Sequence, residues 1–283
     1  MCAKRNKSIT DKIISKRLSE GRCDGDKENY KPWANIQELN SNGIVGRHYS
    51  NKTNRLHHLT SELETNYFYL LEWSDKVIDI KERYALKDID LAMKIAVDRN
   101  INYPVDPVSK TPLILTSDFM ITFNDNNTST EVVRELIHSK ELSKKRVLEV
   151  LEIKRAYWEE KGVPFGIVTE KEIPRIYALN VEWIHKYHNE LSIPFEVGVA
   201  RNYIEVLAYE MKKSEKDILM VKLTTALDKT YSLENGSFLS LLRYCIANKI
   251  FSVNMSEKLL VKCTIGDFST KINITNKEIR KTL

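Results

Sequence analysis

Three acidic side chains, Glu64, Asp118 and Glu135, have types and spacings that could gather around a metal ion. Asp118 and Glu135 are 17 residues apart, on two segments with the residue pattern of a hairpin, and Glu64 begins a helical pattern. The three could therefore converge on one frame. Hard cations such as Mg²⁺ prefer carboxylate oxygens, and ions held in this way activate water in phosphodiester hydrolysis.

Each acid also has a purely structural interpretation. Glu64 occupies the third helical position of a capping box and could bond only the backbone at the helix start. Asp118 could simply begin a β-segment. Glu135 could face solvent on an edge strand and pair with Arg134 or Lys140. The acids alone leave both interpretations open.

The first part of the chain predicts an α/β domain with a mixed sheet. We place this domain at residues 32–171, after a basic N-terminal arm at residues 1–31. The elements expected in chain order are a helix over 61–73, a strand over 77–82, a hairpin of 113–123 with 130–137, a helix over 140–161 and a strand over 164–168.

Residues 172–283 predict a mostly helical second domain. Helical patterns cover residues 215–230 and 237–249, and extended segments follow at 251–254 and 258–261. A helix, a turn, a second helix and a hairpin in this order are typical of a winged helix.

The basic charge is concentrated at the N-terminus. Net charge is +5, and residues 1–60 alone hold twelve basic and six acidic side chains. Such clusters, among them residues 4–7, could neutralise DNA phosphates, although a solvated basic tail has the same composition. His57 and His58 are adjacent on an extended segment, so they should point to opposite sides and not share a metal. The candidate DNA contacts are Lys16, Arg17, Arg22, Lys31, Arg47 and His57.

Nothing in the composition indicates a membrane or secreted protein. No apolar run reaches the roughly 18–20 residues that span a bilayer, and the N-terminus lacks a signal-peptide pattern. The four cysteines form no CxxC pair, so we expect free thiols rather than disulfides or a structural zinc site. The expected location is the cytoplasm.

Several short motifs occur together in a consistent order over about residues 17–185. Together they resemble TnsA, the endonuclease subunit of heteromeric DNA transposases. The motifs are Tyr30-Lys31-Pro32-Trp33, Tyr49-Ser50, His57-His58-Leu59 with Thr60 to Glu64, Leu71-Glu72-Trp73, Ser117-Asp118-Phe119, and Leu151-Glu152-Ile153-Lys154-Arg155-Ala156-Tyr157-Trp158.

The resemblance implies a restriction-endonuclease-like domain of the PD-(D/E)xK class that cuts the 5′ ends of a mobile element in a bacterial cytoplasm. It implies two bound Mg²⁺ ions as the cofactor, with Mn²⁺ able to replace them. Double-stranded DNA at transposon ends, a TnsB-type transposase for the 3′ ends and a TnsC-type ATPase regulator are the implied partners. The metal ligands implied are Glu64, Asp118 and Glu135.

One residue departs from the resembled family. The family has a lysine two residues after its third polar motif position, and that third position is Glu135 in this chain. The residue at the lysine position is Ile137. In this nuclease class that lysine positions the attacking water and stabilises charge in the transition state. On the wheel of the helix expected over 140–161, Lys140 and Lys154 both fall on the apolar stripe. Lys154 is the better substitute, because the resembled family usually has an acid there.

Two other functions remain open at this stage. If Lys154 extends past its apolar neighbours into solvent, the chain is a catalytically silent DNA-binding and assembly subunit of the same complex. A stand-alone restriction-type nuclease would instead cut without partners. In the second domain, Arg243, Lys249 and Lys258 could contact DNA, but the resemblance favours docking of the regulator.

Overall fold

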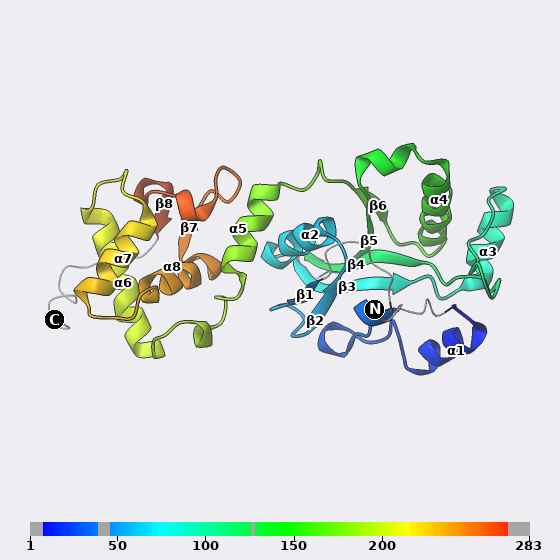
Figure 1. The fold of residues 1–283 in the computed structure, drawn as a ribbon, viewed down its shortest axis with the longest axis horizontal. Helices are drawn as coiled ribbons and strands as arrows, with labels where there is room; N and C mark the ends of the chain where they lie inside the picture. The colour runs from blue at the N-terminus through cyan, green and yellow to red at the C-terminus, as the bar shows by residue number, and fades with distance from the viewer. Residues whose placement is uncertain (1–7, 39–45, 126–127, 271–283) are drawn as a thin grey trace, which may run out of the picture. The chain divides into compact units, whose positions relative to one another are not determined.

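The computed structural model describes residues 8–38, 46–125 and 128–270. The chain divides into two compact units, residues 1–173 and residues 174–283, and each is considered separately (Figure 1). No helix within the described ranges combines the length and the apolar character that crossing a bilayer requires.

A four-stranded mixed sheet forms the centre of the first unit (Figure 1). The strand order is β3-β4-β5-β6, antiparallel except for the parallel pair β5–β6. A parallel pair needs a crossover, and helix α4 supplies it. The predicted mixed sheet and hairpin are therefore confirmed. The strands are β3 (Val77–Ala85), β4 (Thr116–Asp125), β5 (Thr128–Leu136) and β6 (Phe165–Val168).

Three helices and a small hairpin surround this sheet. Helices α3 and α4 lie together and bury Ile95, Ile153 and Trp158 against Met120 of β4 in one apolar core. Hairpin β1–β2 pairs antiparallel before α2 begins. The bounds are β1 (Gly46–Tyr49), β2 (Leu56–Leu59), α2 (Glu62–Trp73), α3 (Ile89–Asp98) and α4 (Lys145–Glu160).

The helix predicted over 140–161 starts later than expected. A separate 3-10 turn, η3 (Ser139–Ser143), comes first, and the extended backbone of Lys144 separates it from α4. Lys140 is exposed on this turn and does not belong to the apolar stripe of α4. The helical-wheel argument for Lys140 was wrong for this reason.

The predicted N-terminal arm is wrong for residues 8–31, which fold onto the first unit. After α1 (Asp11–Ser19), the side chains of Cys23, Tyr30 and Trp33 are buried and form a second core with Ala85 of β3. Residues 1–7, which hold the basic cluster at 4–7, lie outside the described residues.

The second unit is mostly helical, as predicted, with one short antiparallel pair. The second strand expected at 258–261 is wrong, because the 3-10 turn η5 (Leu260–Lys262) begins within that segment. The Leu260 N–H donates to Asn180 Oδ1 of α5 at 2.9 Å instead of to a strand. The partner of β7 is β8 instead. The elements are α5 (Arg175–His185), α6 (Val197–Lys213), α7 (Met220–Thr230), α8 (Ser237–Ala247), β7 (Phe251–Val253) and β8 (Phe268–Thr270).

The expected free thiols are confirmed for the three described cysteines. Cys23, Cys245 and Cys263 are buried and unpaired with one another. Cys2 lies outside the described residues.

Candidate active site

Asp118 lies where two central strands separate. The β4–β5 ladder begins with Phe119 opposite Arg134, one step beyond Asp118. At that point the Asp118 side chain replaces the ladder, because its Oδ2 accepts a hydrogen bond from the backbone N–H of Leu136 at 2.7 Å. A carboxylate fixed in this way at the opening between two strands is held on a rigid frame.

Glu135 is buried on β5 at the same level of the sheet and is 2% exposed. Lys154 Nζ of α4 lies 2.7 Å from its Oε2. Its Oε1 is buried and meets no donor at good hydrogen-bond geometry among the described residues, although the Ser117 hydroxyl is near. Burial raises the pKa of Glu135 to about 7; Lys154 opposes the shift, and the charge of Asp118 adds to it.

Glu64 lies in the first turn of α2, and its carboxylate bonds the backbone of Thr60 rather than that of Ser61. The Ser61 hydroxyl accepts from Glu64 N at 3.1 Å, as a helix cap should. The Glu64 carboxylate accepts from both the backbone N–H and the hydroxyl of Thr60, each at 2.9 Å, and Arg83 lies 3.3 Å from Oε2. Burial raises the pKa of Glu64, Asp118 raises it further, and Arg83 opposes them.

Asp118 therefore acts electrostatically on both other acids, so the structure brings the three predicted residues into one neighbourhood. Within the described residues, no three His, Cys, Asp or Glu side chains form a group that could hold an ion. Each glutamate has partners of its own: Glu64 bonds Thr60 and Arg83, and Glu135 bonds Lys154.

Of the two candidate lysines, the structure places only Lys154 at this site. Its side chain is 12% exposed and its ammonium contacts Glu135, so it does not extend past its neighbours into solvent. Ile137, at the family's lysine position, lies just beyond the end of β5 and its N–H donates to Val168 O at 3.1 Å.

The predicted DNA contacts separate into two groups. Lys16, Lys31 and Arg47 are exposed, although Lys16 Nζ lies 3.7 Å from Glu20 Oε1 and Lys31 Nζ donates to Glu20 O at 3.1 Å. Arg17 and Arg22 are wrong as free DNA contacts, because both guanidinium groups face Glu38. Arg17 is 3.7 Å from it, and Arg22 makes two hydrogen bonds to it.

His57 is also wrong as a DNA contact, because its ring is completely buried. Its Nε2 lies 2.9 Å from the Thr53 hydroxyl and its Nδ1 lies 2.9 Å from Glu82 Oε2. It belongs to a buried polar network rather than to an exposed surface.

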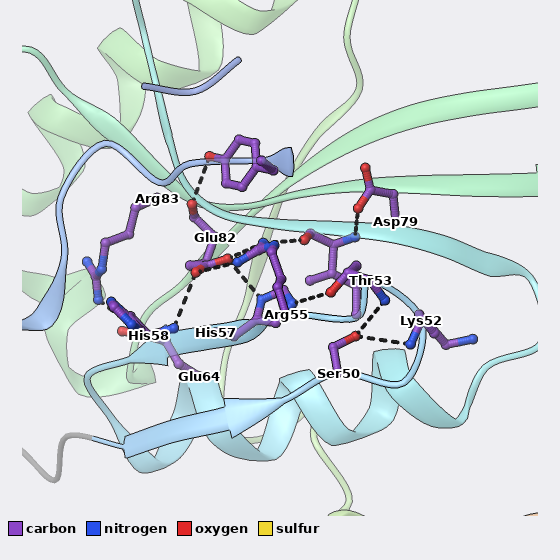
Figure 2. Close-up of polar contacts among 12 residues, drawn as sticks. Ser50, Lys52, Thr53, Arg55, His57, His58, Glu64, Asp79, Glu82 and Arg83 are labelled. Carbon is purple, nitrogen blue, oxygen red and sulfur yellow. Dashed lines mark hydrogen bonds and ion pairs between the residues drawn. The ribbon is translucent and has the colours of Figure 1, made fainter. Parts of the chain in front are cut away.

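That network centres on Glu82 of β3 and was missed by the sequence reasoning (Figure 2). Arg55 donates to both carboxylate oxygens of Glu82, at 2.9 and 2.5 Å, and His58 N donates to Oε1 at 3.2 Å. Burial alone would raise the pKa of Glu82, but His57 and Arg55 outweigh it and hold the pKa well below its ordinary value. The available signal was the three charged residues Asp79, Lys81 and Glu82 inside the strand expected over 77–82, since charges in a buried strand require partners.

In the second unit, the candidate basic residues Arg243 and Lys258 have internal partners. The Arg243 guanidinium stacks on Trp183, 4.0 Å from the ring centroid, and donates to the Tyr187 hydroxyl at 2.9 Å. Lys258 lies 2.8 Å from Asp267. Arg243 is thus a structural residue here, and Lys249 is exposed.

Comparisons with known proteins agree with this arrangement. A profile described as TnsA-like endonuclease N terminal matches residues 74–170, and one described as TnsA endonuclease C terminal matches residues 172–255. The transposition protein TnsA of transposon Tn7 from Escherichia coli is 33% identical over 273 residues, which cover 96% of this chain and 97% of that protein. The resemblance seen in the motifs is confirmed, and this chain belongs to the TnsA family, the endonucleases of Tn7-type transposition.

Proposed function

We propose that this chain is an active, metal-dependent endonuclease that cuts the 5′ ends of a mobile element beside a TnsB-type transposase. The observation that carries the proposal is the position of Lys154. Although Ile137 removes the family's lysine, the ammonium of Lys154 lies 2.7 Å from Glu135, at the end of the sheet where Asp118 is fixed. This contact supports Lys154, on a helix instead of a strand, as the ammonium group that this chemistry requires.

The donor set fits a divalent cation such as Mg²⁺ or Mn²⁺, in one or two positions. Glu64, Asp118 and Glu135 supply only hard oxygen donors, and Glu135 Oε1 is a buried oxygen without a well-placed hydrogen-bond donor. The effect of Asp118 on the pKa of both glutamates is the mutual repulsion that a bound cation relieves. When bound, the metal would supply charge neutralisation and a more acidic water.

The protein's own groups have separable tasks. Asp118 is oriented by the N–H of Leu136 and Glu64 by Thr60, so two of the carboxylates are fixed before DNA arrives. Lys154 holds a proton donor and a positive charge at the buried end of the site, where it can orient water and stabilise the developing negative charge. The dry surroundings strengthen each of these interactions.

The same proposal assigns a fold to each of the two units and a partner to the second unit. The mixed sheet with α2 and α4 suits a restriction-endonuclease-like fold, and the second unit suits a winged-helix derivative in which β7 and β8 form the short wing. Because Arg243 and Lys258 have internal partners, we assign the second unit to docking of a TnsC-type regulator rather than to DNA. The site of action is then element DNA in the cytoplasm.

The experiment uses the full chain, the TnsB-type and TnsC-type proteins of the same element, a plasmid carrying both element ends, and Mg²⁺. Wild-type protein should give breaks at the 5′ ends as well as the 3′ ends. Asp118→Asn should remove only the 5′ breaks. The matched control is Asp125→Asn on the same strand, whose exposed carboxylate pairs with Lys76 and should be dispensable.

A second function is favoured by one observation, the isoleucine at position 137. If Lys154 cannot replace the family's lysine, the chain is a catalytically silent assembly subunit. Wild-type protein would then support 3′ breaks only, and Asp118→Asn would behave like wild type. That outcome would reject the proposed cleavage activity.

A further inference from the structure

Arg83 has a backbone conformation that its place in a strand does not explain. Its neighbours pair regularly, Glu82 with Phe119 and Tyr84 with Ser117, which puts Arg83 at the level of Asp118. Yet its φ is +52°, in the left-handed region. For a non-glycine residue this conformation is unfavourable and persists only where the surroundings impose it.

The N-terminal segment imposes it. The carbonyl oxygen of Arg83 accepts from Trp33 N at 3.3 Å and from the Cys23 thiol at 3.5 Å. The preceding carbonyl, of Glu82, accepts from the Tyr30 hydroxyl at 2.9 Å. The Cys23 and Tyr30 side chains and the Trp33 N–H therefore hold the carbonyl groups of Glu82 and Arg83 in place.

The result is that the Arg83 side chain leaves the Glu82 network and reaches Glu64. Figure 2 shows it extending away from Glu82, on the side where Glu64 is labelled. Its NH2 group donates to the Thr60 hydroxyl at 2.6 Å and to Glu64 Oε2 at 3.3 Å. The side chain is 12% exposed, and its Nε is buried without a hydrogen bond to any described residue.

Thr60 links the two charged groups. It takes a hydrogen bond from Arg83 on its hydroxyl oxygen, and it donates that hydroxyl to Glu64 Oε1 and its N–H to Glu64 Oε2. Both oxygens of Glu64 are thus fixed by a chain of contacts that begins at Arg83. One lone pair of Oε1 remains unused by these contacts.

We propose that Arg83 is a positioning residue that holds the Glu64 carboxylate, directly and through Thr60, in the orientation the cleavage site uses. The inference rests on the proposed function. Retaining a positive charge at position 83 is not sufficient for this role, because one guanidinium nitrogen, Nη2, must reach both Thr60 and Glu64. Lysine, a point charge on a flexible stem, lacks the planar guanidinium fork that fixes the position of this nitrogen.

The decisive variant is therefore Arg83→Lys, which retains the charge near the metal site and removes the fork. Mn²⁺ binding to the full chain is measured by titration calorimetry without DNA, and 5′ cleavage is measured with the partner proteins. We expect both to fall by about tenfold, as is typical when a partner that orients a metal ligand is lost. Thr60→Val should give a similar loss and Thr60→Ser should retain function, so a variant at position 83 that fails to fold leaves the inference testable.

The matched control is Arg55→Lys, which removes the fork on Glu82 instead of Glu64. It should lower the melting temperature and leave the Mn²⁺ affinity of the folded protein unchanged. Equal loss of Mn²⁺ binding in Arg55→Lys and Arg83→Lys would overturn the inference, because general destabilisation would then explain both.

The outcomes separate the inference from the proposed function. Wild-type affinity and cleavage in both Arg83→Lys and Thr60→Val, with cleavage still lost in Asp118→Asn, would reject the role of Arg83 alone. Failure of wild-type protein to bind Mn²⁺ would reject the proposed function and the inference together.

Discussion

Two buried glutamates on β3 and β5, the strands on either side of β4, have opposite surroundings. Glu82 on β3 is met by Arg55, His57 and His58 N, and its pKa is held well below the ordinary value. Glu135 on β5 has one cation and one oxygen without a well-placed donor, and burial raises its pKa to about 7. Both side chains are buried to the same degree, so burial does not distinguish a structural carboxylate from a candidate catalytic one. The number of hydrogen-bond donors and cations around each carboxylate does distinguish them.

The largest effect that tests this contrast is on stability. Glu82→Gln leaves the Arg55 guanidinium buried without its counter-ion, and breaking one partner of a buried ion pair typically costs about 3–5 kcal/mol. We expect the free energy of unfolding, measured with urea, to fall by that amount while Mn²⁺ affinity is retained. Glu159→Gln, which removes an exposed partner of Arg155, is the control and should change stability by less than about 1 kcal/mol. A loss of Mn²⁺ binding in Glu82→Gln would show that the two glutamates are not functionally distinct.

The next effect is on cleavage. Lys154→Ala should reduce 5′ cleavage by about a hundredfold, because it removes the charge and proton donor beside Glu135. Lys140→Ala is the matched control, since Lys140 is exposed on η3 and should be dispensable. Adding Ile137→Lys to Lys154→Ala returns a lysine to the family's position and should recover part of the rate. Unchanged cleavage in Lys154→Ala would remove the basis for an active site at Glu135.

The contrast between these glutamates also shows what the sequence could predict. The hairpin and α2 follow from local patterns, so Asp118, Glu135 and Glu64 could be placed on their elements in advance. Helical spacing and the motif comparison favoured Lys154 as the lysine that faces the sheet, but its contact with Glu135 was not predicted. Local patterns alone could not show that Lys140 falls on a separate 3-10 turn.

Contacts between distant segments account for most of the remaining errors. The residues before Trp33 looked like a solvated arm because their composition is polar, yet Cys23 and Tyr30 are buried against β3. Arg17 and Arg22 looked available to DNA until Glu38 was placed beside them. His57 looked like a surface residue because its partner Glu82 is 25 residues away in the chain.

A pH titration sharpens the comparison through the sign of its slope. The folded pKa of Glu135 lies at about 7, above its ordinary value of 4.5, so the folded state binds more protons than the unfolded state between these values. Stability of the metal-free protein should therefore fall as pH rises from about 4.5 to about 7, by on the order of 3–4 kcal/mol, and stay level at higher pH. The raised pKa of Glu64 acts in the same direction.

Glu82 contributes with the opposite sign, because its folded pKa is lowered. Its stabilisation is present above about pH 4.5 and is lost as the pH falls further. Urea unfolding of wild type and Glu135→Gln at a series of pH values isolates the Glu135 contribution. The difference between the two proteins should vary across pH 4.5–7 and become constant above it. A difference independent of pH would mean that Glu135 is ionised throughout.

The smallest effect concerns exposed basic side chains, which we compare with a basic side chain that is buried in the fold. Lys16 and Arg47 are exposed, so replacing both with alanine should leave stability within about 0.5 kcal/mol of wild type. If both contact phosphates, the double variant should bind element-end DNA more weakly, and the slope of log affinity against log salt should become shallower by about 2. Replacing the exposed Lys145 and Lys171 removes the same charge elsewhere, so an equal loss in that control would indicate a general charge effect. Arg17→Ala should show the reverse behaviour, lower stability with an unchanged salt slope, because its guanidinium faces Glu38 and Trp33 rather than solvent.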